Sequence, residues 1–158
     1  MKATARAHPI QGLVKYHGMR DPDRRLPYHD SISLCTAPSA STTTASFGSV
    51  EADTISIDGE LVEGRSRERV LSVIDRVRTL ADIDDAVRLE SFSTFPPTIG
   101  FGPSSPGFAA AALAASRAAG LELSAPELSA VARLGSSSAA RAVTGSFSQL
   151  DTGLDDVD

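Results

Sequence analysis

A loop of small residues has the composition and the position to bind an anion. It runs from Pro96 to Pro106, after an expected strand over 87–92 and before an alanine-rich segment, Phe108 to Ala119, that we expect to be helical. The first backbone N–H groups of a helix lack intrahelical partners, and the helix dipole favours negative charge beside them. The order strand, loop, helix therefore predicts a phosphate site, with Gly107 near the start of the helix.

The loop carries no standard phosphate-binding motif. No lysine follows the glycines, which excludes G-x-x-x-x-G-K-[ST]. The spacing of Gly100, Gly102 and Gly107 does not fit G-x-G-x-x-G. An ordinary surface loop therefore remains the alternative interpretation of this segment.

A second serine-led segment is another candidate anion site. Residues Ser136 to Val143 are expected to form a short helix that begins with serines and carries Arg141. The planar guanidinium of arginine pairs with a carboxylate or phosphate through two parallel hydrogen bonds. The alternative is a capping serine followed by a surface arginine.

Composition excludes several classes of protein. The chain of 158 residues is long enough for one domain with a core, and its net charge of −5 argues against non-specific nucleic-acid binding. No apolar run reaches the roughly 20 residues of a membrane span, and no secretory leader is recognisable at the N-terminus. The single Cys35 and the absence of metal-binding Cys and His motifs predict a cytoplasmic protein with no structural metal site.

The hydrophobic pattern predicts strands in the first part of the chain and mixed strands and helices after it. Strands are expected over 3–8, 12–18, 31–36, 42–47, 54–57, 60–62 and 87–92, with a polar loop over 21–27. Helices are expected over 65–81, over 108–119 with Gly120 as the C-terminal glycine, and from Ser124 to Gly135. The strand over 12–18 would place Lys15 and His17 on one face and Tyr16 on the other. This order predicts an α+β fold in which helices cover one side of a mainly antiparallel sheet.

Four segments resemble the N-terminal lobe of ATP-dependent mevalonate phosphate and diphosphate decarboxylases, which belong to the GHMP kinase superfamily. The matching segments are Ala7 to Asp21 with its Lys-Tyr pair, Leu26 to Ser33, the loop from Pro96 to Ala110, and Gly-Ser-Ser-Ser-Ala-Ala-Arg at 135–141. The resemblance implies a ribosomal-protein-S5-domain-2-like lobe over 1–150 and a frayed acidic tail over 151–158. It also implies that the second lobe of the family is absent from this sequence.

The activity that the resemblance implies belongs to the mevalonate pathway of isoprenoid biosynthesis. Such an enzyme uses Mg²⁺ and ATP to phosphorylate the tertiary hydroxyl of mevalonate 5-phosphate or 5-diphosphate. Loss of that phosphate and of CO₂ then gives isopentenyl phosphate or diphosphate. The alternatives are another small-molecule kinase of the superfamily and a non-catalytic fragment. A homodimer, or a second lobe encoded separately, would supply what the single lobe lacks.

The resemblance also implies roles for individual residues. The ATP phosphates would be held by Gly100, Gly102, Ser104 and Ser105. The substrate would be contacted by Lys15, Tyr16, His17, Ser136, Ser138 and Arg141. No catalytic residue and no metal ligand is assigned in this half, because the catalytic aspartate of the family lies in the second lobe.

Three positions depart from the family pattern. Met19 replaces a lysine that lies near the diphosphate of the substrate, and Pro103 and Pro106 replace serines of the phosphate loop. Proline lacks the N–H that could bind a phosphate. The loss of one cation at position 19 favours a monophosphate substrate, although a methionine that simply fills space is the alternative.

Overall fold

The computed structural model describes residues 1–96 and 104–152. Its larger sheet has five strands in the order β1 (Lys2–Ala7), β6 (Ser41–Phe47), β9 (Val87–Ser93), β7 (Thr54–Ile57) and β8 (Glu60–Leu61). All neighbouring pairs are antiparallel except β7 and β9, which are joined through a helix and run parallel. Buried and more exposed residues alternate along β6 and β9, because one face of the sheet packs on the helices.

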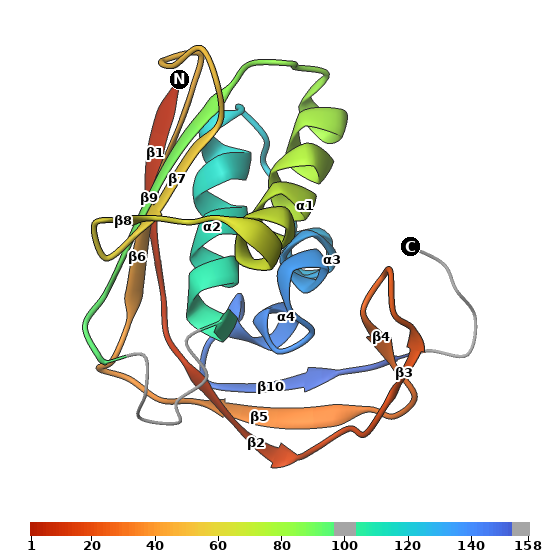
Figure 1. Ribbon diagram of the computed structural model, residues 1–158. Helices are drawn as coiled ribbons and strands as arrows, with labels where there is room; N and C mark the ends of the chain where they lie inside the picture. The colour runs from red at the N-terminus through yellow and green to blue at the C-terminus, as the bar shows by residue number, and fades with distance from the viewer. Residues whose placement is uncertain (97–103, 153–158) are drawn as a thin grey trace.

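Four helices lie on that face of the sheet (Figure 1): α1 (Gly64–Ala81), α2 (Ser104–Ala118), α3 (Ala125–Gly135) and α4 (Ala139–Ala142). Helix α2 packs against β1 and β6, and its alanines are buried nearly all round the helix. Such small side chains let the helix approach the sheet and its neighbouring helices closely. The expected α+β fold, with a mostly antiparallel sheet and helices on one side, is confirmed.

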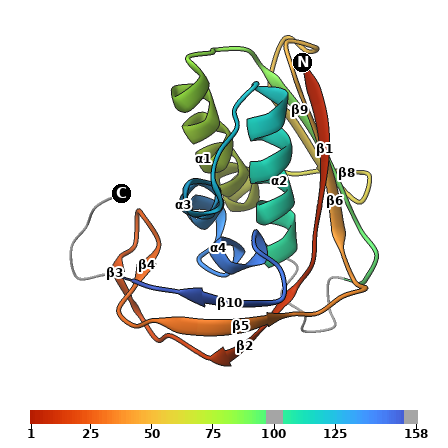
Figure 2. The ribbon, with the colours of Figure 1, turned by 180° about the vertical axis from the view of Figure 1, so that it is seen from behind.

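A smaller sheet lies across the end of the helix layer, next to α4 (Figures 1 and 2). Its strands follow the order β10 (Phe147–Leu150), β5 (Ser31–Cys35) and β2 (Ile10–Val14), and β3 (Met19–Asp21) pairs separately with β4 (Leu26–Pro27). The hydroxyl of Ser148 in β10 donates to the carbonyl of Arg141 at 3.1 Å, which fixes α4 above this sheet.

Several boundaries predicted from the sequence are wrong. The strand expected over 12–18 is observed at Ile10–Val14, because Val14 pairs with Ile32 and the antiparallel partner strand β5 begins only one residue earlier, at Ser31. Helix α2 begins at Ser104 rather than near Gly107. Pro106 fits in its first turn, because the backbone N–H that proline lacks would have no intrahelical partner there. Strand β10 was not predicted, and the loop expected over 21–27 contains β4.

Two helix ends agree with their sequence signals. Gly120 has a φ of 81°, and its N–H donates to Arg117 while the N–H of Leu121 donates to Ser116, which is a Schellman motif. At the start of α3, the Glu127 carboxylate accepts the Ser124 N–H at 2.8 Å.

The end of the described chain is anchored to the smaller sheet. The Thr152 N–H donates to Asp30 at 2.8 Å, and the Arg20 guanidinium donates to the Thr152 carbonyl at 2.6 Å. The rest of the expected tail, 153–158, lies outside the described residues. No helix in the described ranges is long and apolar enough to cross a membrane.

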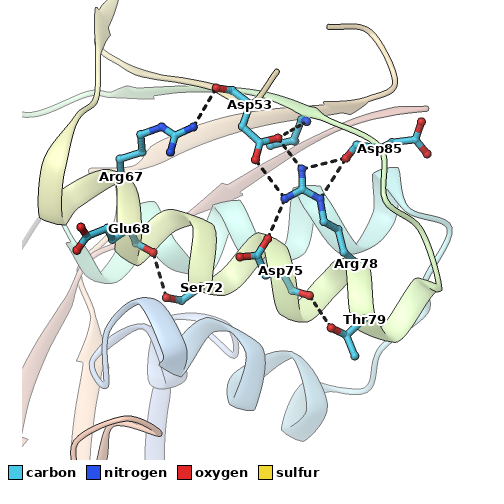
Figure 3. A network of polar contacts seen from close by, with 9 residues as sticks. Asp53, Arg67, Glu68, Ser72, Asp75, Arg78, Thr79 and Asp85 are labelled. Atoms are coloured by element: carbon cyan, nitrogen blue, oxygen red, sulfur yellow. Dashed lines mark hydrogen bonds and ion pairs between the residues drawn. The ribbon is translucent and has the colours of Figure 1, made fainter. Parts of the chain in front are cut away.

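A network around Arg78 ties α1 to the larger sheet (Figure 3). The guanidinium contacts both carboxylate oxygens of Asp53, at 2.5 and 3.2 Å, and also the Asp75 carboxylate at 2.8 Å. It further donates to the carbonyl of Asp85, and Asp53 accepts the Val87 N–H that leads into β9. Burial alone would raise the pKa of Asp53, but the hydrogen bonds from Arg78 and Val87 outweigh it and hold the pKa below its ordinary 3.8.

Replacing Arg78 with methionine should lower the free energy of unfolding by about 2 kcal/mol at neutral pH, because it strands a mostly buried carboxylate. Asp53 has a lowered pKa, so its contribution is present above pH 3.8 and disappears as the pH falls through the folded-state value. The difference between the two proteins in urea unfolding should therefore shrink in acid. Arg76→Met, at an exposed position of the same helix, is the control. An equal loss in both variants at every pH would contradict the prediction.

Candidate functional site

Arg141 is a buried cation that the described residues leave incompletely paired. It is only 6% exposed, and its Nε and Nη1 atoms have no hydrogen-bond partner in the described part of the chain. Its guanidinium carbon lies 5.6 Å from the ring centre of Tyr16. Burial lowers the pKa of Arg141, and the nearby Tyr16 opposes that shift. A buried charge without a full set of partners is costly, so this arrangement is typical of a site for an anionic ligand.

Next to Arg141, the loop between α3 and α4 presents two hydroxyls side by side. The oxygens of Ser136 and Ser138 are 2.9 Å apart. Ser137 points the other way, because its hydroxyl donates to the Arg25 carbonyl at 2.7 Å and lies 3.6 Å from the sulfur of Met19. The loop is therefore fastened by its middle residue, while the flanking serines pair with each other.

The Lys-Tyr-His run follows β2 instead of lying within it. The prediction that Lys15 and His17 share one face of a strand is wrong, since β2 ends at Val14. Lys15 and His17 are exposed, and the aliphatic part of Lys15 lies over Gly12. Tyr16 is half-buried and is the member of the run that the structure brings to Arg141.

A cavity of about 250 Å³ opens between α1, α2 and the inner face of β6 and β9. Ser104 lines it at the first position of α2, and Phe108 lines it one turn later. Ser105, next to Ser104 in the first turn of α2, is buried. Gly100, Gly102 and Pro103 lie outside the described residues. The start of α2 therefore borders a cavity, as expected for a helix that receives part of a ligand.

The sheet side of this cavity carries hydroxyls that sequence analysis did not identify as site residues. Ser91 pairs with Thr43 at 2.9 Å, and Ser93 pairs with Ser41 at 3.0 Å, on the inward face of β9 and β6. Asp58 after β7, and Ser66 and Arg69 of α1, add further polar groups to the wall of the cavity. These residues could have been found from the sequence, because inward positions of a strand normally carry apolar residues and here carry serines.

The described part of the chain contains no preformed cluster of metal-ligating side chains. Within residues 1–96 and 104–152, no three histidine, cysteine, aspartate or glutamate side chains gather in a way that could hold a metal ion. Mg²⁺ in phosphate-handling sites often takes one or two protein ligands and completes its shell with phosphates and water. The two regions thus offer contacts for anionic groups rather than a preformed metal cage.

Comparison with known proteins shows which family the chain resembles. Residues 7–158 match the family model described as the diphosphomevalonate decarboxylase-like N-terminal domain. The chain is 62% identical over 159 aligned residues to the phosphomevalonate decarboxylase of Haloferax volcanii, and covers 100% of its own length and 49% of that protein.

Solved structures show the same similarity. The mevalonate diphosphate decarboxylase of Staphylococcus aureus is 33% identical with a TM-score of 0.91, over 98% of this chain and 47% of that one. The protein MDDEF, solved in complex with MVAPP, AMPPCP and magnesium, is 34% identical with a TM-score of 0.91, over 99% and 48% of the two chains. The chain thus spans about half the length of the relatives that it matches.

Proposed function

Because the chain belongs to the family of diphosphomevalonate decarboxylase-like N-terminal domains, we propose that it forms the ATP- and substrate-binding lobe of a mevalonate 5-phosphate decarboxylase. The observation that carries the proposal is the buried Arg141, two nitrogens of which have no hydrogen-bond partner among the described residues, beside Tyr16 and the Ser136–Ser138 loop. The substrate has two anionic ends, a carboxylate and a phosphate, and each suits a guanidinium or a pair of hydroxyls.

The proposed reaction gives these residues a chemical task. ATP supplies the phosphoryl group that converts the tertiary hydroxyl of the substrate into a leaving group. When that phosphate leaves with its electron pair, positive charge grows at C3, and the C–C bond to the carboxylate supplies electrons as CO₂ departs. Arg141 would orient the carboxylate or the phosphate of the substrate, and Ser136 and Ser138 would donate hydrogen bonds to the same anions.

The nucleotide would lie along the cavity at the start of α2. The cavity volume of about 250 Å³ is below that of typical ligand pockets, which is about 300–1,000 Å³. It therefore suits one part of ATP, with the phosphates directed at the backbone N–H groups of the first turn at Ser104 and Ser105. Gly100 and Gly102 remain proposed phosphate contacts. The related MDDEF binds AMPPCP with magnesium, which supports ATP and Mg²⁺ as ligands of this family.

The replacement of the family's lysine by Met19 favours a monophosphate substrate. Its sulfur lies 3.6 Å from the hydroxyl of Ser137, which points away from Ser136 and Ser138, so the proposal rests on the replacement of the family's lysine and not on this contact. A lysine at this position would supply a charge-assisted hydrogen bond worth about 1.5–3 kcal/mol to a second phosphate, and methionine supplies none. The relative from Haloferax volcanii, at 62% identity, is a phosphomevalonate decarboxylase.

We expect the complete two-lobe protein to have a higher kcat/KM for mevalonate 5-phosphate than for the 5-diphosphate. Met19→Lys should shift that preference toward the diphosphate by about 10-fold or more, as follows from the value of one charge-assisted hydrogen bond. The measurement is kcat/KM for both substrates. Leu13→Lys adds the same charge at an exposed position of β2 and should change nothing. A wild type that prefers the diphosphate would refute the substrate assignment, and an unmoved preference in Met19→Lys would remove Met19 as its cause.

The remaining assignments extend the proposal. We infer that 1–150 is the lobe and 151–158 an acidic tail, and that the catalytic group is contributed from outside this half. Lys15 and His17 are proposed to reach the substrate from the segment after β2. A homodimer or a separately encoded second lobe, and the cytoplasm as the location, stay predictions.

A further inference from the structure

The inward face of β5 carries serines where a sheet packed on helices usually carries apolar residues. Ser31 and Ser33 are both completely buried, and neither hydroxyl has a hydrogen-bond partner among residues 1–96 and 104–152. Ile32 and Leu34, which alternate with them, lie on the outward face and are partly exposed. Because a buried hydroxyl without a partner is costly, these two serines require an explanation.

Helix α4, which carries Arg141, lies over this face of the smaller sheet (Figures 1 and 2). Ser148 of β10 is paired with Ser33 of β5, and the Ser148 hydroxyl donates to the Arg141 carbonyl at 3.1 Å. The backbone of Arg141 is therefore held above the part of the sheet where Ser33 points inward.

The side chain of Arg141 extends from there toward the start of β5. Its guanidinium carbon lies 5.6 Å from the ring centre of Tyr16, which follows closely after the end of β2 at Val14. Val14 pairs with Ile32, the neighbour of Ser31 in β5. Arg141 thus runs along the face that the two serines form. Its Nε and Nη1 atoms, like the two hydroxyls, are buried without a partner in the described part of the chain.

Resting on the proposed function, we infer that Ser31 and Ser33 are positioning residues that hold the Arg141 guanidinium through buried water. A guanidinium N–H can only donate a hydrogen bond, whereas a serine hydroxyl both donates and accepts. A water molecule accepts from the N–H and donates to the serine oxygen, and buried water makes about three such hydrogen bonds. This network fixes the guanidinium from the side of the sheet, in the orientation in which it meets an anionic group of the substrate.

The alternative is that the two serines only fill space between α4 and the smaller sheet. Alanine would then serve equally well, because it has nearly the same size. The two roles are separable by kinetics. A residue that acts through Arg141 loses its effect when Arg141 itself is replaced, whereas an independent structural residue keeps it.

The test is a double-mutant cycle in the complete two-lobe protein, measured by steady-state kinetics. Ser31→Ala/Ser33→Ala should raise the KM for mevalonate 5-phosphate by about 10-fold, the size expected for one lost hydrogen bond to a charged group. The kcat and the KM for ATP should stay near the wild-type values, because the lost interaction serves substrate binding. In the Arg141→Lys background the same change should alter this KM by less than about 2-fold. Either single serine substitution carries the test if the pair does not fold.

Ser116→Ala is the matched control. Ser116 is also a buried serine, 1% exposed, whose hydroxyl has no partner within the described ranges. It lies in α2, near the end of that helix that is farther from α4 (Figure 1). This variant should keep the wild-type KM for mevalonate 5-phosphate.

A crystal structure of the complete protein without substrate gives a readout that does not depend on activity. It should show water within hydrogen-bond distance of an Arg141 nitrogen and of the hydroxyl of Ser31 or Ser33. A guanidinium without such water, a wild-type KM in the serine variants, or an equal rise of KM in the Arg141→Lys background would overturn this inference alone. A wild type that does not turn over mevalonate 5-phosphate would overturn the proposed function, and the bridging water would still decide this inference.

Discussion

Arg141→Lys in the complete protein should lower kcat/KM by about 100-fold, and Arg141→Met by more. Each hydrogen bond to a charged group contributes about 1.5–3 kcal/mol, and lysine cannot reproduce the paired N–H groups of the guanidinium. Methionine removes the charge as well and leaves the anion of the substrate unpaired in a buried site.

Although Arg141→Met should lose activity, its thermal stability should not fall. Arg141 is buried, and two of its nitrogens lack a hydrogen-bond partner within residues 1–96 and 104–152, so its removal relieves an incompletely compensated charge. We therefore expect Arg141→Met to unfold at a temperature equal to or above that of the wild type. Steady-state kinetics and thermal unfolding check the two halves of the prediction.

Arg117→Lys is the control for Arg141. Arg117 pairs with Glu122 at 2.9 Å on the surface, with half of its side chain exposed, and such pairs contribute little. It should retain the wild-type kcat/KM. Wild-type kinetics in Arg141→Lys would show that the paired hydrogen bonds of Arg141 are not needed for substrate binding. A clear loss of stability in Arg141→Met would show that Arg141 serves the fold.

Gly135→Ala should destabilise the protein by about 1–3 kcal/mol, the usual cost of overpacking, and should lower activity through the adjacent serine loop. A Cβ at position 135 would lie 2.2 Å from Cδ1 of Phe108 and 2.4 Å from its Cγ, distances at which one of the two must move. Without this contact, Gly135→Ala would increase the free energy of unfolding, because Gly→Ala at an unstrained position stabilises a protein by about 0.4–1 kcal/mol. The sign of the change in urea unfolding thus reports the contact directly.

A double-mutant cycle isolates the cause. Phe108→Ala removes the three nearest atoms that the new methyl group would meet, so Gly135→Ala should cost much less in that background. Gly107→Ala is the control, since a Cβ there meets nothing within 4 Å. Equal costs of Gly135→Ala in both backgrounds would contradict the packing explanation.

The sequence by itself determined most of the elements. Local sequence patterns predicted the strands that became β1, β5, β6 and β9, and the helix expected over 65–81 is α1, in which Val70, Ile74 and Val77 are buried at helical spacing. Leu80 continues that spacing but is 40% exposed, because α1 ends one residue later. The helix expected from Ser124 is α3, which buries Leu128, Val131 and Ala132. These patterns work because burial of one face imposes a period that a few neighbouring residues reveal.

For the site, the sequence identified candidates but not their arrangement. Similarity of motifs singled out Arg141 and Tyr16, which lie 125 positions apart in the chain, and only the fold brings the guanidinium to the ring. Arg69 carried no local signal, because an arginine in a helix is usually a solvated residue of its polar face. Its partners, Phe108 and Gly135, come from two other helices. Local pattern encodes which residues face inward, whereas the meeting of residues from separate elements depends on how those elements pack, and that is decided by the tertiary structure.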